Sequence, residues 1–144
     1  MMNQGGATLT VLVVEDDVFL AELIRQVLND VRGWGATVVH DARAARLVIQ
    51  YVDIDVLITD VNLPGISGLA LVKRLRQAST WRKPPVLLMS ADPNQAAIQE
   101  ALHDHLVDRF IRKPFDVDQL VRELRATIEE GGVSSPLADS SQPM

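Results

Sequence analysis

Residues 9–17 read LTVLVVEDD, an apolar run that ends abruptly in three acidic side chains. The run is short and rich in branched aliphatic residues, which is typical of a strand buried on both faces of a sheet. Apolar residues then recur at helical spacing from Leu20 to Val31. A buried strand followed by an amphipathic helix is the unit from which parallel α/β sheets are built.

The same unit recurs along the rest of the chain. Further strands are predicted at residues 37–40, 56–59, 86–90 and 110–112. Amphipathic helical stripes lie at 44–52, 71–75, 98–102 and 117–128. Right-handed crossovers leave few topologies open. The sequence therefore predicts an α/β fold of the flavodoxin-like (βα)5 type, with a doubly wound five-stranded parallel sheet in the order 2-1-3-4-5.

Local signals mark the starts of two helices. Asp17 follows the first strand and is predicted to be the N-cap of the first helix. Asp92 is followed by Pro93, so Asp92 is predicted to be the N-cap of the fourth helix, with proline at its first position.

The last helix carries signals at both ends. Asp116 and Gln119 predict a capping box, and Phe115 with Leu120 predicts the hydrophobic staple that accompanies it. Gly131-Gly132 is predicted to end the helix. The sequence thus predicts one domain over residues 9–130, a flexible N-terminus at 1–8, and a disordered tail or linker stub at 131–144.

Composition limits the classes of function. The 144 residues carry a net charge of −5 and no cysteine, which argues against a general nucleic-acid surface, a disulfide framework and thiolate chemistry. The basic patches at 81–83 and 109–113 are short and are interpreted as solvated surface. There is no signal-peptide pattern and no apolar run near the roughly 18 residues that span a bilayer. We expect a cytoplasmic protein that does not enter a membrane.

Polar side chains follow the predicted strands at corresponding places. They are Glu15, Asp16 and Asp17 after the first strand, Asp60 after the third, Ser90 at the end of the fourth and Lys113 after the fifth. Carboxyl ends of parallel strands share one edge, and open sheets place their sites where the strand order reverses. Clustered carboxylates repel one another, and a hard divalent cation relieves the conflict. With no His or Cys in these motifs, the predicted ion is Mg²⁺.

The residue types indicate roles in phosphoryl transfer. Glu15 and Asp16 would hold the ion, and Asp60 would be both ligand and nucleophile. The backbone carbonyl of Asn62 is predicted to complete the ligand set. Lys113 would reach over Asp60, held in an extended turn by Pro114, with a cis bond between them expected. Ser90 would donate its hydroxyl to a phosphoryl oxygen.

Plainer interpretations exist for each of these residues. Asp60 could be a turn residue before Pro64-Gly65, and Glu15 and Asp16 could simply favour the helix dipole. His40, His103 and His105 are interpreted as solvated or packed side chains.

Four segments of the chain resemble the receiver domain of two-component response regulators, over about residues 9–128. They are VLVVEDD at 11–17, LITDVNLPGISG at 57–68, LLMSA at 87–91 and KPF at 113–115. The resemblance implies that a histidine kinase or phosphotransfer protein phosphorylates Asp60. It also implies that Ser90 and Phe110 form a switch pair, and that the face made by helix 4, strand 5 and helix 5 then changes its protein partners or dimerises.

The sequence departs from that family at several places. Phe110 stands where the family often has tyrosine, so it cannot donate a hydrogen bond. Residues 103–107 read HDHLV, and bulky Leu106 and Val107 replace the usual Gly-Ala turn. Receivers with a dedicated output domain continue past helix 5, so the chain resembles the single-domain type or a receiver cut from a larger protein.

Three alternative functions stay open at this level. An aspartate-nucleophile phosphatase needs a second aspartate two residues after the nucleophile, where Asn62 stands. A nucleotide- or flavin-binding module needs a Gly- or Ser/Thr-rich loop after the first strand, where the three acids stand. A receiver-like scaffold that is never phosphorylated would not need Asp60, Ser90 and Lys113 together.

Overall fold

The computed structural model describes residues 9–78, 82–92 and 95–131 of the chain. Its strands are β1 (Leu9–Val14), β2 (Trp34–Val39), β3 (Val56–Asp60), β4 (Val86–Ser90) and β5 (Arg109–Arg112). Its helices are α1 (Val18–Asn29), α2 (Ala42–Tyr51), α3 (Gly68–Gln77), α4 (Ala96–His103) and α5 (Val117–Glu130). All strand pairs are parallel, and the order β2-β1-β3-β4-β5 is the predicted one.

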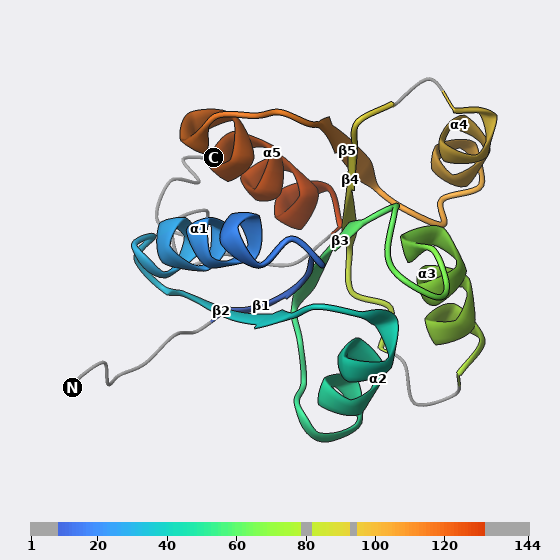
Figure 1. Cartoon of the computed structure of the whole chain (residues 1–144), viewed down its shortest axis with the longest axis horizontal. Coiled ribbons are helices and arrows are strands. Elements are labelled where there is room, and N and C mark those ends of the chain that lie inside the picture. The colour runs from blue at the N-terminus through green and yellow to red at the C-terminus, as the bar shows by residue number, and fades with distance from the viewer. Residues whose placement is uncertain (1–8, 79–81, 93–94, 132–144) are drawn as a thin grey trace, which may run out of the picture.

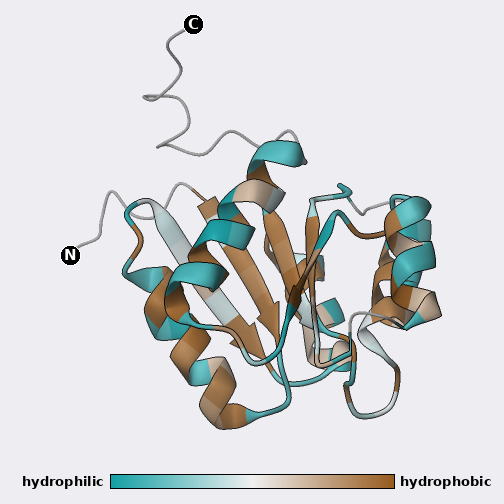
Figure 2. Ribbon diagram, turned by 90° about the horizontal axis from the view of Figure 1, so that it is seen from above, coloured by the Kyte–Doolittle hydropathy of each residue, from teal (hydrophilic) through white to brown (hydrophobic). Residues whose placement is uncertain are grey.

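Helices cover both faces of the sheet (Figure 1). Helices α1 and α5 bury Ile24, Leu28 and Leu124 against one face. Helices α2, α3 and α4 bury residues such as Ala45 and Leu71 against the other. Figure 2 shows the apolar central strands between helices that mix hydrophilic residues with exposed apolar ones, such as Phe19 and Leu23 of α1. The central strands are buried on both sides, which explains their continuous apolar sequences.

The strand register brings the carboxyl ends of the sheet together. Val14, the last residue of β1, pairs with Thr59, and Asp60 pairs with Met89. The next residue after β1 is Glu15, so it lies beside Asp60 at the same edge. The Lys113 amide donates to the Ser90 carbonyl, 2.8 Å away, which continues the alignment past β5.

Strand β2 begins three residues before the predicted start at residue 37. It opens at Trp34, which pairs with Leu9 and is buried, with the Arg125 guanidinium 5.1 Å from the centre of its ring. Glycine at position 35 and the partial burial of most of β2 hide this start in the sequence, because the strand lies at the edge of the sheet.

Two predicted helix starts are confirmed and one is wrong. The Asp17 carboxylate accepts the amides of Phe19 and Leu20, as an N-cap does. The capping box of Asp116 and Gln119 is also present. Helix α4, however, begins at Ala96 with Gln95 at its N-cap position, so Asp92 is not its N-cap.

The Asp92 amide instead donates to the Ser90 hydroxyl at 3.0 Å, in a local turn after β4. Aspartate and serine side chains can stabilise turns as well as helix caps, and here the turn prevails. Pro93, the other half of the predicted signal, lies outside the described residues.

Helix α5 ends at Glu130 with Gly131 at its C-cap, as predicted. The reason is not a left-handed cap, because Gly131 has a φ of −79°. A Cβ at residue 131 would lie 2.3 Å from the Cβ of Pro85, so this glycine permits close approach to the segment before β4. The predicted N-terminus at 1–8 lies outside the described residues, as does the predicted tail at 131–144 except for its first residue.

The loop at 103–107 forms its turn without glycine. His105 adopts a φ of 59°, and the amides of Leu106 and Val107 both donate to the Ala101 carbonyl. Val107 is buried in the core, and Arg76 donates to the Leu106 carbonyl at 2.9 Å. Packing of the two bulky residues therefore holds the turn in place. Among the described residues, no helix is long and apolar enough to cross a membrane.

Candidate functional site

Three carboxylates meet at the carboxyl edge of the sheet. Glu15 and Asp16 directly follow β1, and Asp60 is the last residue of β3. One oxygen from each lies within 4.8 Å of the others. The predicted acidic cluster is therefore assembled in the folded chain, from segments more than forty positions apart in the sequence.

Lys113 reaches into this cluster from the segment after β5. Its Nζ donates to Asp60 Oδ2 and to Glu15 Oε1, each at 2.7 Å. The sequence predicts the contact with Asp60 but not the one with Glu15. The Lys113–Pro114 peptide bond is cis, as expected. We call the group formed by Glu15, Asp16, Asp60 and Lys113 the acidic crevice.

The members of the crevice differ in exposure. Glu15 is fully buried and Asp60 is 5% exposed, whereas Asp16 is exposed. A buried charge is costly unless a partner compensates for it, and Lys113 is the cation that does so here. Asp16 is thus the carboxylate that faces solvent.

Burial and charge shift two pKa values in the crevice. Burial raises the pKa of Glu15, and the nearby charge of Asp60 acts in the same direction. Hydrogen bonds from Lys113 and from the Asp17 amide oppose this only in part, so the pKa stays above its ordinary value. Burial alone would lower the pKa of Lys113, but hydrogen bonds and charges from Asp60 and Glu15 outweigh it, and the pKa is raised.

The backbone around Asp60 is held closely. The Asn62 amide donates to Asp60 Oδ1 at 3.1 Å, and the Thr59 hydroxyl donates to the Asp60 carbonyl at 3.1 Å. Gly68 opens α3 immediately beside this carbonyl, since a Cβ at residue 68 would lie 2.0 Å from the Asp60 oxygen. The carboxylate of Asp60 is therefore oriented by one amide and one ammonium group.

The two predicted switch residues lie on neighbouring strands. Ser90 ends β4 and is buried, and its hydroxyl oxygen accepts the Asp92 amide. Phe110 is half-buried on β5, pairs with Leu88 and packs against the core on the α2, α3 and α4 side. Ser90 and Phe110 therefore lie on the half of the sheet formed by β4 and β5. The family resemblance predicts the switch at this place.

The donor set fits a hard divalent cation. Three carboxylates and one ammonium leave two negative charges in the crevice when all are ionised. All the clustered groups offer oxygen, and carboxylate oxygens are the protein ligands that Mg²⁺ prefers. Asn62, predicted as a carbonyl ligand, contributes its amide to Asp60, and the role of its carbonyl stays a prediction.

Sequence reasoning missed two features of this site. Gly68 is one, and the signal was available, because Ser67 followed by glycine and an apolar helix marks a helix start. His40 is the other, with Nδ1 3.0 Å from the Glu15 carbonyl oxygen. No local pattern links residues 40 and 15, which meet only because β1 and β2 are neighbours.

An open parallel sheet with an acidic crevice at its switch point, and with helices on both faces, defines a doubly wound α/β domain of the flavodoxin-like class. Comparison of sequences makes the assignment specific. Residues 11–125 match the family model of the response regulator receiver domain. The chain belongs to this family and is a receiver domain of two-component response regulators.

Individual relatives agree with the family. The chain is 32% identical over 141 residues to the probable transcriptional regulatory protein TcrX of Mycobacterium tuberculosis, covering 94% of this chain and 56% of that protein. Its structure resembles the chemotaxis response regulator CheY4 of Vibrio cholerae, with a TM-score of 0.74, 26% identity, and coverage of 84% of this chain and 99% of that one.

The structure is about equally similar to the receiver domain of the Francisella response regulator 1452. The TM-score is 0.73 and the identity 28%, with coverage of 84% of this chain and 97% of that one. The chain spans about half the length of the sequence relatives it matches, such as 56% of TcrX and 48% of TcrA of M. tuberculosis.

Proposed function

We propose that this receiver domain is a phosphoacceptor switch in which Asp60 accepts a phosphoryl group from a histidine kinase or phosphotransfer protein. The observation that carries the proposal is the environment of the Asp60 carboxylate. One oxygen accepts the Asn62 amide and the other accepts Lys113 Nζ, while Glu15 and Asp16 stand alongside. An oriented carboxylate beside a cation-binding cluster is what phosphoryl transfer needs, since positioning and neutralisation of charge supply most of its catalysis.

In the proposed transfer a carboxylate oxygen of Asp60 attacks phosphorus. The new O–P bond forms as the P–N bond of a phosphohistidine donor breaks, and the electron pair returns to the imidazole nitrogen. Bound Mg²⁺ would neutralise charge on the phosphoryl oxygens. Glu15 and Asp16 would hold the ion, and the Asn62 carbonyl would add a ligand. Lys113, which is already 2.7 Å from Asp60 Oδ2, would donate to a phosphoryl oxygen.

The switch follows from the same residues. The Ser90 hydroxyl, whose oxygen accepts the Asp92 amide, has a proton that it could donate to a phosphoryl oxygen. Movement of Ser90 would free space for Phe110 to turn inward, and the surface of α4, β5 and α5 would change its protein partners or dimerise. Helix α4 suits such a role, because it has eight residues and no side-chain N-cap bond.

The domain would catalyse only its own phosphorylation and dephosphorylation. A phosphatase would need a general acid where Asn62 stands, and an amide side chain does not supply one. Relatives such as TcrX are named as transcriptional regulatory proteins, so regulation of transcription through a partner or a further domain is the output we infer.

Labelling with acetyl phosphate and Mg²⁺ tests the proposal. The expected product carries one phosphoryl group, detected by intact mass and removed by hydroxylamine, and Asp60→Asn abolishes it without loss of fold. Asp17→Asn is the matched control, because it removes a neighbouring carboxylate and keeps an N-cap residue. Labelling of the Asp60→Asn protein would place the acceptor elsewhere, and turnover of a generic phosphate ester would restore the phosphatase alternative.

A further inference from the structure

Helices α2 and α3 carry five basic side chains and no acidic ones. The basic residues are Arg43 and Arg46 of α2 and Lys73, Arg74 and Arg76 of α3. The whole chain has 19 acidic residues against 14 lysines and arginines. The two helices contact each other, and all of these side chains except that of Arg76, which donates to the Leu106 carbonyl, are exposed, so they form a basic surface on an acidic protein.

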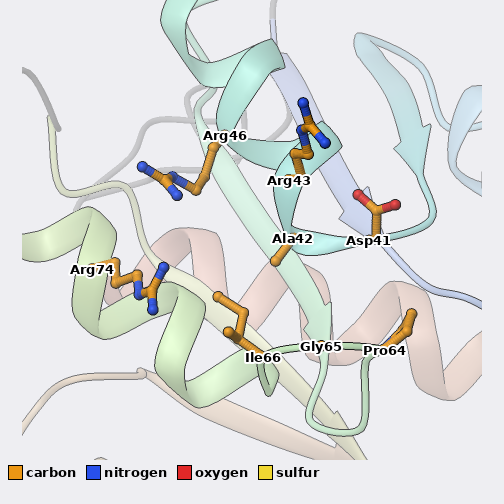
Figure 3. Close-up of a pocket in the computed structure, with 8 residues that line it drawn as sticks. All are labelled: Asp41, Ala42, Arg43, Arg46, Pro64, Gly65, Ile66 and Arg74. Atoms are coloured by element: carbon orange, nitrogen blue, oxygen red, sulfur yellow. The ribbon is translucent and has the colours of Figure 1, made fainter.

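Three of these arginines line one pocket. It lies between α2, α3 and the loop at 64–66, and its volume is about 560 Å³. Figure 3 shows the Arg46 side chain extending from α2 and the Arg74 guanidinium lying beside Ile66, whereas the Arg43 guanidinium points away from both. Arg43 stands on the α2 side of the pocket, one turn before Arg46. We call this cavity the arginine pocket.

The three arginines of the pocket carry charges that are unpaired among the residues that the structure describes. Within the described ranges, Arg43, Arg46 and Arg74 form no ion pair and no side-chain hydrogen bond. Arg43 and Arg46 are three positions apart on one helix, where like charges repel. The one carboxylate in the lining, that of Asp41, accepts the Ala44 amide at 2.7 Å as the N-cap of α2. Three positively charged side chains thus line the cavity, and none of them is paired with a counter-charge in the part of the chain that the structure describes.

We propose that the arginine pocket binds a small oligophosphate, either an inorganic phosphate chain or a nucleoside triphosphate. Guanidinium groups bind phosphate through paired N–H donors, and several such groups spaced around one pocket favour a ligand with several phosphates. The volume lies within the range of small-molecule pockets, which is about 300–1,000 Å³. Ala42 and Ile66 offer an apolar wall against which a nucleobase can lie.

The lining argues against a protein partner at this place. Binding energy between proteins concentrates in tryptophan, tyrosine and arginine side chains packed in fully desolvated pockets, whereas the three arginines here are exposed. The arginine pocket is concave and has no aromatic residue in its lining. It is also distinct from the acidic crevice, since none of Glu15, Asp16, Asp60 and Lys113 lines it. The inference therefore does not depend on phosphorylation of Asp60.

Titration calorimetry with the whole chain in EDTA tests the proposal, with inorganic tripolyphosphate and ATP as probes. We expect saturable one-to-one binding that Arg46→Ala and Arg74→Ala each weaken by about tenfold. Arg122→Ala is the matched control, because Arg122 is an exposed arginine on α5, remote from the pocket, and should change affinity by less than about twofold. Asp60→Asn should bind as the unmodified chain does. Tighter binding of ATP than of tripolyphosphate identifies a nucleotide, and equal binding identifies the phosphate chain.

Several results would overturn the proposal. They are absence of saturable binding by the unmodified chain, equal weakening by Arg122→Ala, or normal binding by both pocket variants. Binding of a glutamate-rich peptide that depends on Arg46, with no binding of tripolyphosphate, would assign the pocket to an acidic protein segment instead. Nitrogen NMR of the arginine side chains in the unmodified chain gives a readout independent of any variant, because Arg46 and Arg74 signals should shift and the Arg122 signal should not.

Discussion

The loop that joins β3 to α3 follows Asp60 of the acidic crevice and supplies residues 64–66 to the arginine pocket, and the two sites hold their charges in opposite ways. In the crevice, Glu15 and Asp60 are buried and share Lys113 at 2.7 Å. In the pocket, Arg46 and Arg74 are exposed and have no partner among the described residues. When one partner of a buried charge pair is removed, the folded state is strongly destabilised, so such charges are tied to the stability of the fold. Charges that are exposed and unpaired cost folding little and remain available to a ligand.

Gly68→Ala should produce the largest effect on the crevice side of the loop. The added methyl would lie 2.0 Å from the Asp60 carbonyl, so backbone must move. We expect a loss of about 3 kcal/mol or more in the free energy of unfolding, measured by urea denaturation. Gly65→Ala is the control on the pocket side, because residue 65 has a φ of +85° but nothing within 4 Å of its Cβ. Its loss should be about 1–2 kcal/mol, from backbone strain alone. An equal loss in both proteins would contradict the proposed close packing.

Lys113→Ala should destabilise the metal-free chain by about 2–3 kcal/mol, because it leaves two buried carboxylates without a cation. Addition of Mg²⁺ should recover part of the loss, since the ion supplies the missing positive charge. Phosphorylation of Asp60 should then no longer change the affinity for a partner. Lys73→Ala, on exposed α3 surface, should change stability by less than about 0.5 kcal/mol. A normal partner response in Lys113→Ala would remove this residue from the switch.

Glu15→Gln should stabilise the metal-free chain at neutral pH. The pKa of Glu15 is raised in the folded state, so the folded chain binds its proton more tightly than the unfolded chain does. The unmodified chain therefore loses stability relative to the variant as pH rises above the ordinary value of 4.5 and through the raised one. Below 4.5 the group is neutral in both states, and the difference should vanish. Thermal midpoints in EDTA between pH 4 and 7 measure this, and a constant difference would contradict it.

Arg43→Ala should have the smallest effect. Loss of a side chain with no partner, next to a like charge, should change the free energy of unfolding by less than about 0.5 kcal/mol. A large destabilisation would show that Arg43 stabilises the folded chain, and the arginine pocket would then no longer differ from the acidic crevice in this respect.

The sequence predicts most of the fold because the buried positions of the strands are occupied by apolar residues, which the sequence shows directly. Strands β1 and β4 have the predicted bounds, Leu9–Val14 and Val86–Ser90, since every buried position in them is aliphatic or a small polar end residue. The start of β2 and the start of α4 are predicted less well. At both places edge position or turn chemistry decides the boundary, and neither leaves a periodic pattern.

The acidic crevice is predictable for a related reason. Its members lie at or just after the carboxyl ends of strands. In a parallel sheet these ends share one edge, so the side chains lie close together. The second contact of Lys113, with Glu15, depends on how far a side chain reaches, which spacing does not encode. The arginine pocket is not predictable in this way, because Arg46 and Arg74 lie on different helices whose packing is set by tertiary structure.

The contact between Gly131 and Pro85 places the end of α5 at the amino-terminal rim of the sheet, opposite to Asp60. Helix α5 has 14 residues and so extends about 21 Å at 1.5 Å per residue. Its first turn follows Lys113 closely, and its last turn touches the segment that enters β4. Helix α5 therefore runs from the edge of the sheet that holds Lys113 to the opposite edge. A small tilt of the helix at its Lys113 end would displace its last turn, next to Pro85.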